Sequence, residues 1–232
     1  IVFDSTEGCR GKNPFKQKQI WRAKGIDHRQ GNHALLTKCF EKNGVCFMLQ
    51  IQKLKREEVC AVYNAYMVCD FGQEELKPLN VLLRLLKNGL YMCYGLFEGG
   101  AIQAYACFAK DTASHVLLLD YYAVCSGNRS RGYGSRFLTL LKPELSPFSM
   151  LFAEVEDPAY FCSQEDEATK RRRIAFYEKN GFLKTDMKCT LFGHPYIIMA
   201  LQTAEKPGEQ KNMYQALQRI YHIMFDDQTY AQ

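Results

Sequence analysis

Residues 124–136 read Val124-Cys125-Ser126-Gly127-Asn128-Arg129-Ser130-Arg131-Gly132-Tyr133-Gly134-Ser135-Arg136. An apolar run with strand character precedes this segment and a helical pattern follows it, so the segment is a glycine-punctuated turn from a strand into a helix. Such a turn leaves backbone N–H groups free at the helix N-terminus, where a phosphate binds well. Gly132 and Gly134 permit a close approach, and Arg129, Arg131 and Arg136 add positive charge. The segment therefore predicts an anion site, and a pyrophosphate suits it.

A G-x-G sequence before a helix can also be nothing more than a tight turn, and that alternative stands beside the anion site. Two well-known phosphate-binding motifs do not fit the segment. No Gly-Lys-Ser/Thr follows, as a Walker loop requires, and position 137 is Phe where the Rossmann GxGxxG needs glycine or alanine.

Sequence patterns on either side of the turn predict a series of strands and helices. Alternating or apolar runs predict strands at 47–52, 90–97, 101–109, 115–124, 150–156, 182–191 and 195–201. Helical spacing predicts helices at 56–69, 73–88, 132–142 and 166–180, and a terminal amphipathic helix that carries Met213, Leu217, Ile220 and Met224. This order predicts an α/β fold, with a mixed, mostly antiparallel central sheet flanked by helices and a βαβ crossover through the turn.

Charge and patterning divide the chain into three regions. Residues 1–46 form a basic, weakly patterned N-terminal extension, 47–203 the main domain, and 204–232 a linker with the C-terminal amphipathic helix. The extension holds nine Lys/Arg and four Asp/Glu, which accounts for the whole net charge of +5. The balanced main domain argues against a nucleic-acid partner. One hypothesis places the start of the native domain at Met48, and another makes the basic extension a tether for a nucleic acid or a protein.

Other sequence features bear on location and on metals. No stretch approaches 18 uninterrupted apolar residues, which excludes a helical membrane span, and the start of the chain shows no signal peptide. The ten cysteines include no CxxC or CxxH pair, so we expect neither a zinc site nor a disulfide framework. Reduced, buried thiols predict a cytoplasmic protein without a metal.

Two motifs resemble one known family. The segment Arg129-Ser130-Arg131-Gly132-Tyr133-Gly134 is similar to the R-x-x-G-x-G turn of the GNAT acetyltransferases, and Tyr122-Ala123-Val124 precedes it at that family's usual distance. About 40 residues later, Ile174-Ala175-Phe176-Tyr177-Glu178-Lys179-Asn180-Gly181-Phe182 resembles the family's F-Y-x-x-x-G-F motif. The resemblance covers about residues 47–202.

The resemblance implies the GNAT fold and an acetyl-CoA-dependent N-acetyltransferase. Such an enzyme moves an acetyl group directly to a primary amine, here of a small molecule or peptide, and polarises the thioester carbonyl with backbone hydrogen bonds. It implies that Ala123 and Val124 pair with the pantetheine arm at a splay between strands 115–124 and 150–156, and that Tyr177 is the general acid near the sulfur. The pyrophosphate would lie on the backbone N–H groups of Arg131, Gly132, Tyr133, Gly134, Ser135 and Arg136.

The sequence departs from the family pattern at two positions. Ser130 stands where the first glycine of R-G-x-G-x-G is common. Lys170 stands seven positions before Tyr177, where the family often has an asparagine that contacts CoA. Lys170 belongs to the basic run 170–173, and we expect this run either to lie on a solvated helix face or to reach CoA phosphates.

An amine must lose a proton before it attacks a thioester, so a general base is needed. Asp120 and Glu154 are the candidates. Asp120 lies in an apolar strand and shares a face with Leu118 and Tyr122 by the two-residue period, and burial there should raise its pKa. Glu154 shares a face with Glu156 on the next strand. As an alternative, either acid caps a turn or pairs with an arginine.

The acceptor side has an acidic composition, which would suit a cationic amine. Its acids are Glu154, Glu156, Asp157, Glu165, Asp166 and Glu167. Ordinary solvated loop charge is the alternative. A rival function is a non-catalytic GNAT-like domain that binds acyl-CoA as a sensor or interaction module, and a homodimer is the assembly we consider.

Overall fold

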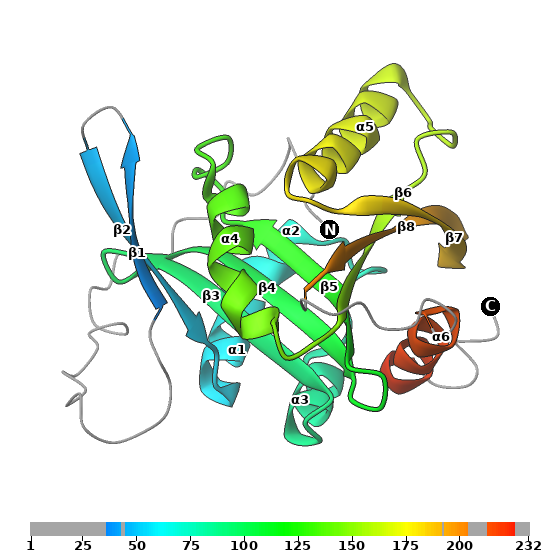
Figure 1. Ribbon diagram of the computed structural model, residues 1–232, viewed down its shortest axis with the longest axis horizontal. Coiled ribbons are helices and arrows are strands. Elements are labelled where there is room, and N and C mark those ends of the chain that lie inside the picture. The colour runs from blue at the N-terminus through cyan, green and yellow to red at the C-terminus, as the bar shows by residue number, and fades with distance from the viewer. Residues whose placement is uncertain (1–35, 43–44, 192, 204–212, 226–232) are drawn as a thin grey trace.

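The computed structural model describes residues 36–42, 45–191, 193–203 and 213–225. Within them the chain forms one eight-stranded sheet in the order β1-β2-β3-β4-β5-β6-β8-β7 (Figure 1). The strands are β1 Leu36–Lys42, β2 Val45–Lys53, β3 Tyr91–Glu98, β4 Ala101–Asp111, β5 Val116–Val124, β6 Met150–Glu156, β7 Leu183–Leu191 and β8 His194–Gln202. The helices are α1 Arg56–Val62, a π-helical turn Tyr63–Met67, α2 Val68–Asp70, α3 Leu79–Lys87, α4 Tyr133–Leu145, α5 Gln164–Lys179 and α6 Met213–Met224.

Strand pairing is antiparallel except between β5 and β6, which run parallel and are joined through α4. The parallel pairing extends from Val116↔Met150 to Leu119↔Ala153. Beyond it, β5 still pairs with β4, and β6 still pairs with β8 as far as Glu156. The two strands therefore splay apart at their carboxyl ends, as the sequence predicted.

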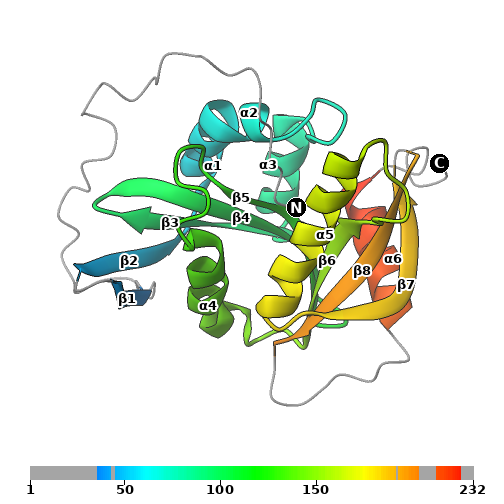
Figure 2. The ribbon, with the colours of Figure 1, turned by 90° about the horizontal axis from the view of Figure 1, so that it is seen from above.

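Helices cover both faces of the sheet. Figure 2 shows α1, α2 and α3 on one face of β3–β5 and α4 on the other, with α5 and α6 on opposite sides of β6 and β8. Apolar side chains on each face form their own buried cluster. The α4–α5 face contains Phe137 and Tyr177, and the α1–α3–α6 face contains Leu82 and Ile220. The predicted α/β architecture is confirmed.

Element boundaries mostly follow the sequence pattern, with two shifts that have a physical cause. The second helix begins at Leu79 rather than 73, because Pro78 takes the N-cap position with extended backbone. The helix after the turn continues to Leu145, beyond its expected end at 142, since Pro143 in its last turn removes a hydrogen bond without ending the helix.

The sheet begins earlier than expected. Strand β1 pairs with β2 from Leu36↔Ile51 to Lys42↔Val45, so the boundary at residue 47 falls inside β2, and Met48 lies opposite Cys39. Part of the segment expected to be a weakly patterned extension therefore belongs to the sheet. The expectations for 1–35 and for the linker at 204–212 lie outside the described residues.

A β-bulge at Asp120 changes which way the side chains of β5 point. Cys107 pairs with Tyr121 and Phe108 with Leu119, so Asp120 is the extra residue on β5. Leu118 belongs to the cluster on the α1–α3–α6 face, whereas Tyr122 belongs to the opposite cluster. The expectation that Leu118 and Tyr122 share a face is wrong, because the bulge reverses the two-residue alternation.

Two further features bear on function. None of the helices in the described ranges is long and apolar enough to cross a membrane. Among the same residues, no cluster of three or more His, Cys, Asp or Glu side chains is arranged to hold a metal ion.

Candidate cofactor and acceptor site

The glycine turn opens into a cavity of about 400 Å³ at the N-terminus of α4. Gly132 is the N-cap and has a left-handed backbone, with φ of 83°, which a Cβ would strain. Tyr122 donates a hydrogen bond to the Gly134 carbonyl at 2.6 Å and so ties the first turn of α4 to β5. The lining from the turn consists of Val124, Asn128, Arg129, Ser130, Gly132, Tyr133, Gly134 and Ser135.

The opposite wall of this cavity comes from α5. Thr169, Arg172, Arg173 and Phe176 line it, and Arg172 donates to the Thr169 hydroxyl at 2.8 Å. A Cβ on Gly134 would lie 3.1 Å from the Phe176 ring, so the glycine allows α4 and α5 to approach closely. Backbone N–H groups at a helix N-terminus and nearby arginines together suit a phosphate chain.

The arginines of the turn have different environments. Arg129 lines the cavity and donates to the buried carboxylate of Asp70, at the end of α2, at 3.3 Å. Arg131 is exposed, and its guanidinium lies 3.5 Å from the Asn128 side-chain oxygen. The backbone N–H of Arg136 already donates to the Gly132 carbonyl at 3.2 Å, so it belongs to the helix ladder rather than to the free N–H groups.

The splay between β5 and β6 exposes a backbone edge next to the cavity. Ala123 and Val124 pair with Tyr105 and Ala104 of β4 on one side, while the β6 side has no pairing past Leu119 within the described strands. Val124 also lines the cavity. An extended ligand arm can therefore add to β5 as a strand would.

Tyr177 lies on the α4–α5 face, next to the cavity-lining residue Phe176. Its ring is fully buried between Phe176 and Phe182, with centroids 5.3 and 5.0 Å away. Its hydroxyl is buried and has no hydrogen-bond partner among the described residues. A buried hydroxyl without a partner is costly, so it is suited to a partner that arrives with a ligand. Burial raises its pKa well above 10, which keeps the hydroxyl protonated.

Glu154 lies on β6 where the splay begins, and its side chain is on the other face, against α6. It is 4% exposed and is the first residue of β6 beyond the parallel pairing. Burial raises its pKa from 4.5 to about 7, and a hydrogen bond from the Tyr221 hydroxyl partly opposes that rise. Its negative charge in turn raises the pKa of Tyr177. A carboxyl group that titrates near neutral pH can accept a proton there.

Asp120 also lies on the α1–α3–α6 face, but both of its oxygens are engaged. Lys77 pairs with one oxygen at 2.8 Å, and the Tyr91 hydroxyl donates to the other. The Lys77 ammonium also lies 5.2 Å from the centre of the Tyr121 ring. These contacts hold the loop before α3 against β5.

Comparisons with solved structures identify the fold. A protein from Bacteroides thetaiotaomicron assigned to the GNAT acetyltransferase family matches with a TM-score of 0.58 and 20% identity, covering 74% of this chain and 95% of its own. The chain has the GNAT fold. An acetyltransferase from Salmonella typhimurium, yncA, solved with its cofactor acetyl-CoA, matches with a TM-score of 0.50 and 17% identity over 70% and 98% of the two chains. By sequence, the chain matches no protein-family model and no curated protein.

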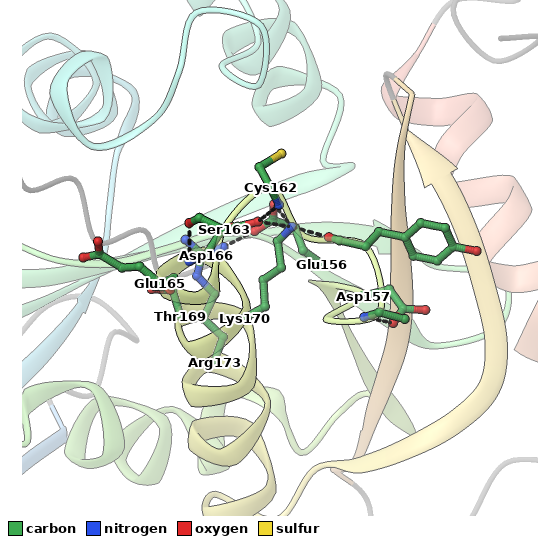
Figure 3. A network of polar contacts seen from close by, with 11 residues as sticks. Glu156, Asp157, Cys162, Ser163, Glu165, Asp166, Thr169, Lys170 and Arg173 are labelled. Atoms are coloured by element: carbon green, nitrogen blue, oxygen red, sulfur yellow. Dashed lines mark hydrogen bonds and ion pairs between the residues drawn. The ribbon is translucent and has the colours of Figure 1, made fainter.

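Lys170, at the position where the GNAT motif often has an asparagine, makes structural contacts in this chain. Lys170 is 8% exposed, donates to the Tyr160 carbonyl at 2.7 Å and pairs with Asp166 at 2.9 Å (Figure 3). It lies 3.8 Å from Glu156, to which Arg173 also donates. Lys170 therefore ties the start of α5 to the preceding loop and does not line the cavity.

Most of the acidic side chains at the end of β6 and in the loop that follows it form ion pairs with basic side chains. Glu156 lies between Lys170 and Arg173, and Asp157 pairs with Lys188 at 2.9 Å. Glu167 pairs with Arg171 at 2.6 Å along α5. Local ion pairs account for most of the acids in the loop, so acidic composition by itself says little about the acceptor.

The site residues predicted from the GNAT motifs fall into two groups. Val124, Arg129, Gly132, Tyr133, Gly134 and Ser135 line the cavity, whereas Ala123, Arg131 and Arg136 do not. Sequence reasoning missed Thr169 and Tyr221. Thr169 lies one turn before Arg173 in the basic run, so its spacing was an available signal. Tyr221 carried no signal, because nothing in the sequence links α6 to β6.

Proposed function

We propose that this GNAT-fold protein is an acetyl-CoA-dependent N-acetyltransferase that acetylates a primary amine of a small molecule or peptide. One observation carries the proposal: Glu154, at the start of the splay, and Tyr177 lie on opposite faces of the sheet and interact electrostatically. The two groups are close enough for the charge of Glu154 to raise the pKa of Tyr177. A protonated hydroxyl and a carboxyl that titrates near neutral pH therefore lie near each other, beside a cavity whose lining suits a phosphate.

The residues present fit acetyl-CoA. The cavity at the N-terminus of α4 suits its pyrophosphate, and the free edge of β5 suits its pantetheine arm. The Tyr177 hydroxyl, which has no partner among the described residues, suits the thioester sulfur. When bound, acetyl-CoA supplies an acetyl group activated as a thioester.

In the proposed reaction Glu154 takes a proton from the acceptor amine, and Tyr177 donates one to the departing sulfur. The amine nitrogen bonds to the acetyl carbon as the carbon–sulfur bond breaks. Glu154 is better placed than Asp120 to be the base, because the ion pair with Lys77 already occupies Asp120. Each proton-transfer role contributes about 10²–10⁴-fold in rate.

Titration calorimetry with acetyl-CoA and with free CoA tests the cofactor site. Arg172→Ala removes a cavity-lining guanidinium, and we expect it to weaken binding about tenfold. Arg171→Ala is the matched control, because Arg171 is the adjacent residue of α5, pairs with Glu167 and does not line the cavity. Saturable binding that is weakened only by the first variant supports the site. Folded protein that binds neither compound contradicts it.

Acetyl transfer to a panel of primary amines, followed by mass spectrometry, tests the activity. We expect Tyr177→Phe and Glu154→Gln each to lower kcat by about 100-fold or more while keeping the affinity for acetyl-CoA. Tight binding of acetyl-CoA without transfer to any amine would contradict the enzymatic function and favour a non-catalytic acyl-CoA-binding module.

We further propose a cytoplasmic setting. Seven cysteines of the residues from 60 to 189 are free thiols, and three of them, Cys93, Cys107 and Cys125, are buried. The homodimer stays a prediction, which sedimentation of the full chain can test.

A further inference from the structure

Helix α6 packs on the α1–α3–α6 face of the sheet, against β4 and β5. Arg219 holds it there through Asp111 at the end of β4, with a nitrogen–oxygen distance of 2.9 Å, and through Ser114. The buried side of the helix consists of Ala216, Leu217, Ile220, Tyr221 and Met224. Four of these five residues have apolar side chains that pack in the core. Tyr221 is the fifth, and its hydroxyl lies on the face of the sheet that carries Glu154.

The Tyr221 hydroxyl donates to Oε1 of Glu154 and lies 3.4 Å from the sulfur of Cys189. Tyr221 is 8% exposed and Glu154 is 4% exposed, so water competes little for this hydrogen bond. No other side chain of the described residues hydrogen-bonds to Glu154, and its Oε2 accepts nothing from them. Among the described residues, α6 thus fixes one carboxylate oxygen, and the other accepts no hydrogen bond.

We propose that Tyr221 is the positioning residue of Glu154 and that α6 thereby forms part of the acceptor site. This inference rests on the proposed function, in which Glu154 is the base. The Tyr221 hydroxyl holds Oε1, which fixes the carboxylate plane and leaves Oε2 to receive the proton of the amine. A tyrosine suits this role because its hydroxyl is carried on a rigid ring that the core of α6 locks in place.

The hydrogen bond also makes the role measurable, because it favours the charged carboxylate and lowers the pKa of Glu154. Other charged and titratable groups around Glu154 also act on its ionisation or are acted on by it. They are Asp120 on β5, Lys77 before α3, Tyr177 on α5, Cys189 on β7 and Tyr196 on β8. Tyr221→Phe leaves all of these in place and removes only the donor.

The test is an infrared titration of Glu154, assigned by difference against Glu154→Gln, in the full chain without substrate. We expect Tyr221→Phe to move the titration of Glu154 upward by about one pH unit. Tyr214→Phe is the matched control, because Tyr214 lies on the same helix and is 59% exposed. The control should titrate as the unmodified protein does. An unshifted titration in folded Tyr221→Phe overturns the inference.

A kinetic test of the same inference uses the acceptor amine identified with the panel of primary amines. We expect Tyr221→Phe to move the acid limb of kcat/KM upward with the titration and to lower kcat, with the KM for acetyl-CoA unchanged. If Tyr221→Phe is active and neither its acid limb of kcat/KM nor the titration of Glu154 moves, the role of Tyr221 is contradicted while the proposed function stands. A shifted titration in a protein that acetylates no amine contradicts the proposed function, and with it any part of α6 in an acceptor site.

Discussion

The guanidinium of Arg129, the first residue of the glycine-turn motif, lies 3.3 Å from the carboxylate of Asp70 at the end of α2. The Tyr105 hydroxyl donates to the other oxygen of Asp70 at 2.8 Å. Burial raises the pKa of Asp70, and these two partners oppose the rise. The glycine turn is thus fixed to α2, on the opposite face of the sheet, through one buried acid.

Replacing this acid should destabilise the fold. We expect Asp70→Asn to lower the free energy of unfolding by about 1–3 kcal/mol, because it weakens two hydrogen bonds to a buried charged group. Urea unfolding measures the change. Asp186→Asn, at an exposed position of β7, is the control and should change stability by less than about 0.5 kcal/mol. Equal stability of the two variants would contradict the structural role of Asp70.

Two glycines of the turn should respond differently to alanine. Gly132→Ala forces a Cβ into a left-handed backbone with open space around it, so we expect about 1–2 kcal/mol of lost stability. Gly134→Ala instead presses on the Phe176 ring at 3.1 Å and should weaken acetyl-CoA binding by narrowing the cavity. Gly72→Ala has neither problem and should be neutral or slightly stabilising. Thermal unfolding and calorimetry together separate the three outcomes.

The raised pKa of Glu154 predicts a specific dependence of stability on pH. In the unfolded chain this carboxyl loses its proton near pH 4.5, whereas in the folded protein it keeps the proton until about pH 7. The folded state binds more protons between these values, so stability falls as pH rises through that window. We expect a loss of about 3 kcal/mol from pH 4.5 to 8 relative to Glu154→Gln, measured by urea unfolding at each pH. A pH-independent difference would show that folding does not change the pKa of Glu154.

Lys170 should matter for stability and little for the cofactor. Lys170→Met removes the contacts with Asp166 and the Tyr160 carbonyl, and we expect it to cost about 1–3 kcal/mol in unfolding free energy. Its affinity for acetyl-CoA should stay within about twofold, because Lys170 does not line the cavity. Lys179→Met, exposed near the end of the same helix, controls for loss of charge. A large loss of affinity with unchanged stability would reverse this assignment.

Local sequence signals predicted many of the residues that line the cavity at the N-terminus of α4. The turn at 124–136 and the aromatic motif around Tyr177 each lie within one short segment, so the motifs located six of the turn residues that line the cavity. The acceptor half depends on contacts that no local pattern contains. The bulge at Asp120 is decided by pairing with β4, and the bond between Tyr221 and Glu154 joins segments whose packing only the folded core determines.

The position of α6 in the chain also has a consequence for the order of folding. Tyr221 follows Glu154 by 67 residues, and Arg219 follows Asp111 by 108. Contacts at such separations form late, because the chain must first close long loops, and during synthesis the N-terminal elements are free to fold earlier. A nascent chain whose sheet has formed but whose α6 has not docked therefore contains the phosphate turn complete and the Glu154 carboxylate without its tyrosine. We therefore expect the cavity at the N-terminus of α4 to form before Glu154 gains its hydrogen bond from Tyr221.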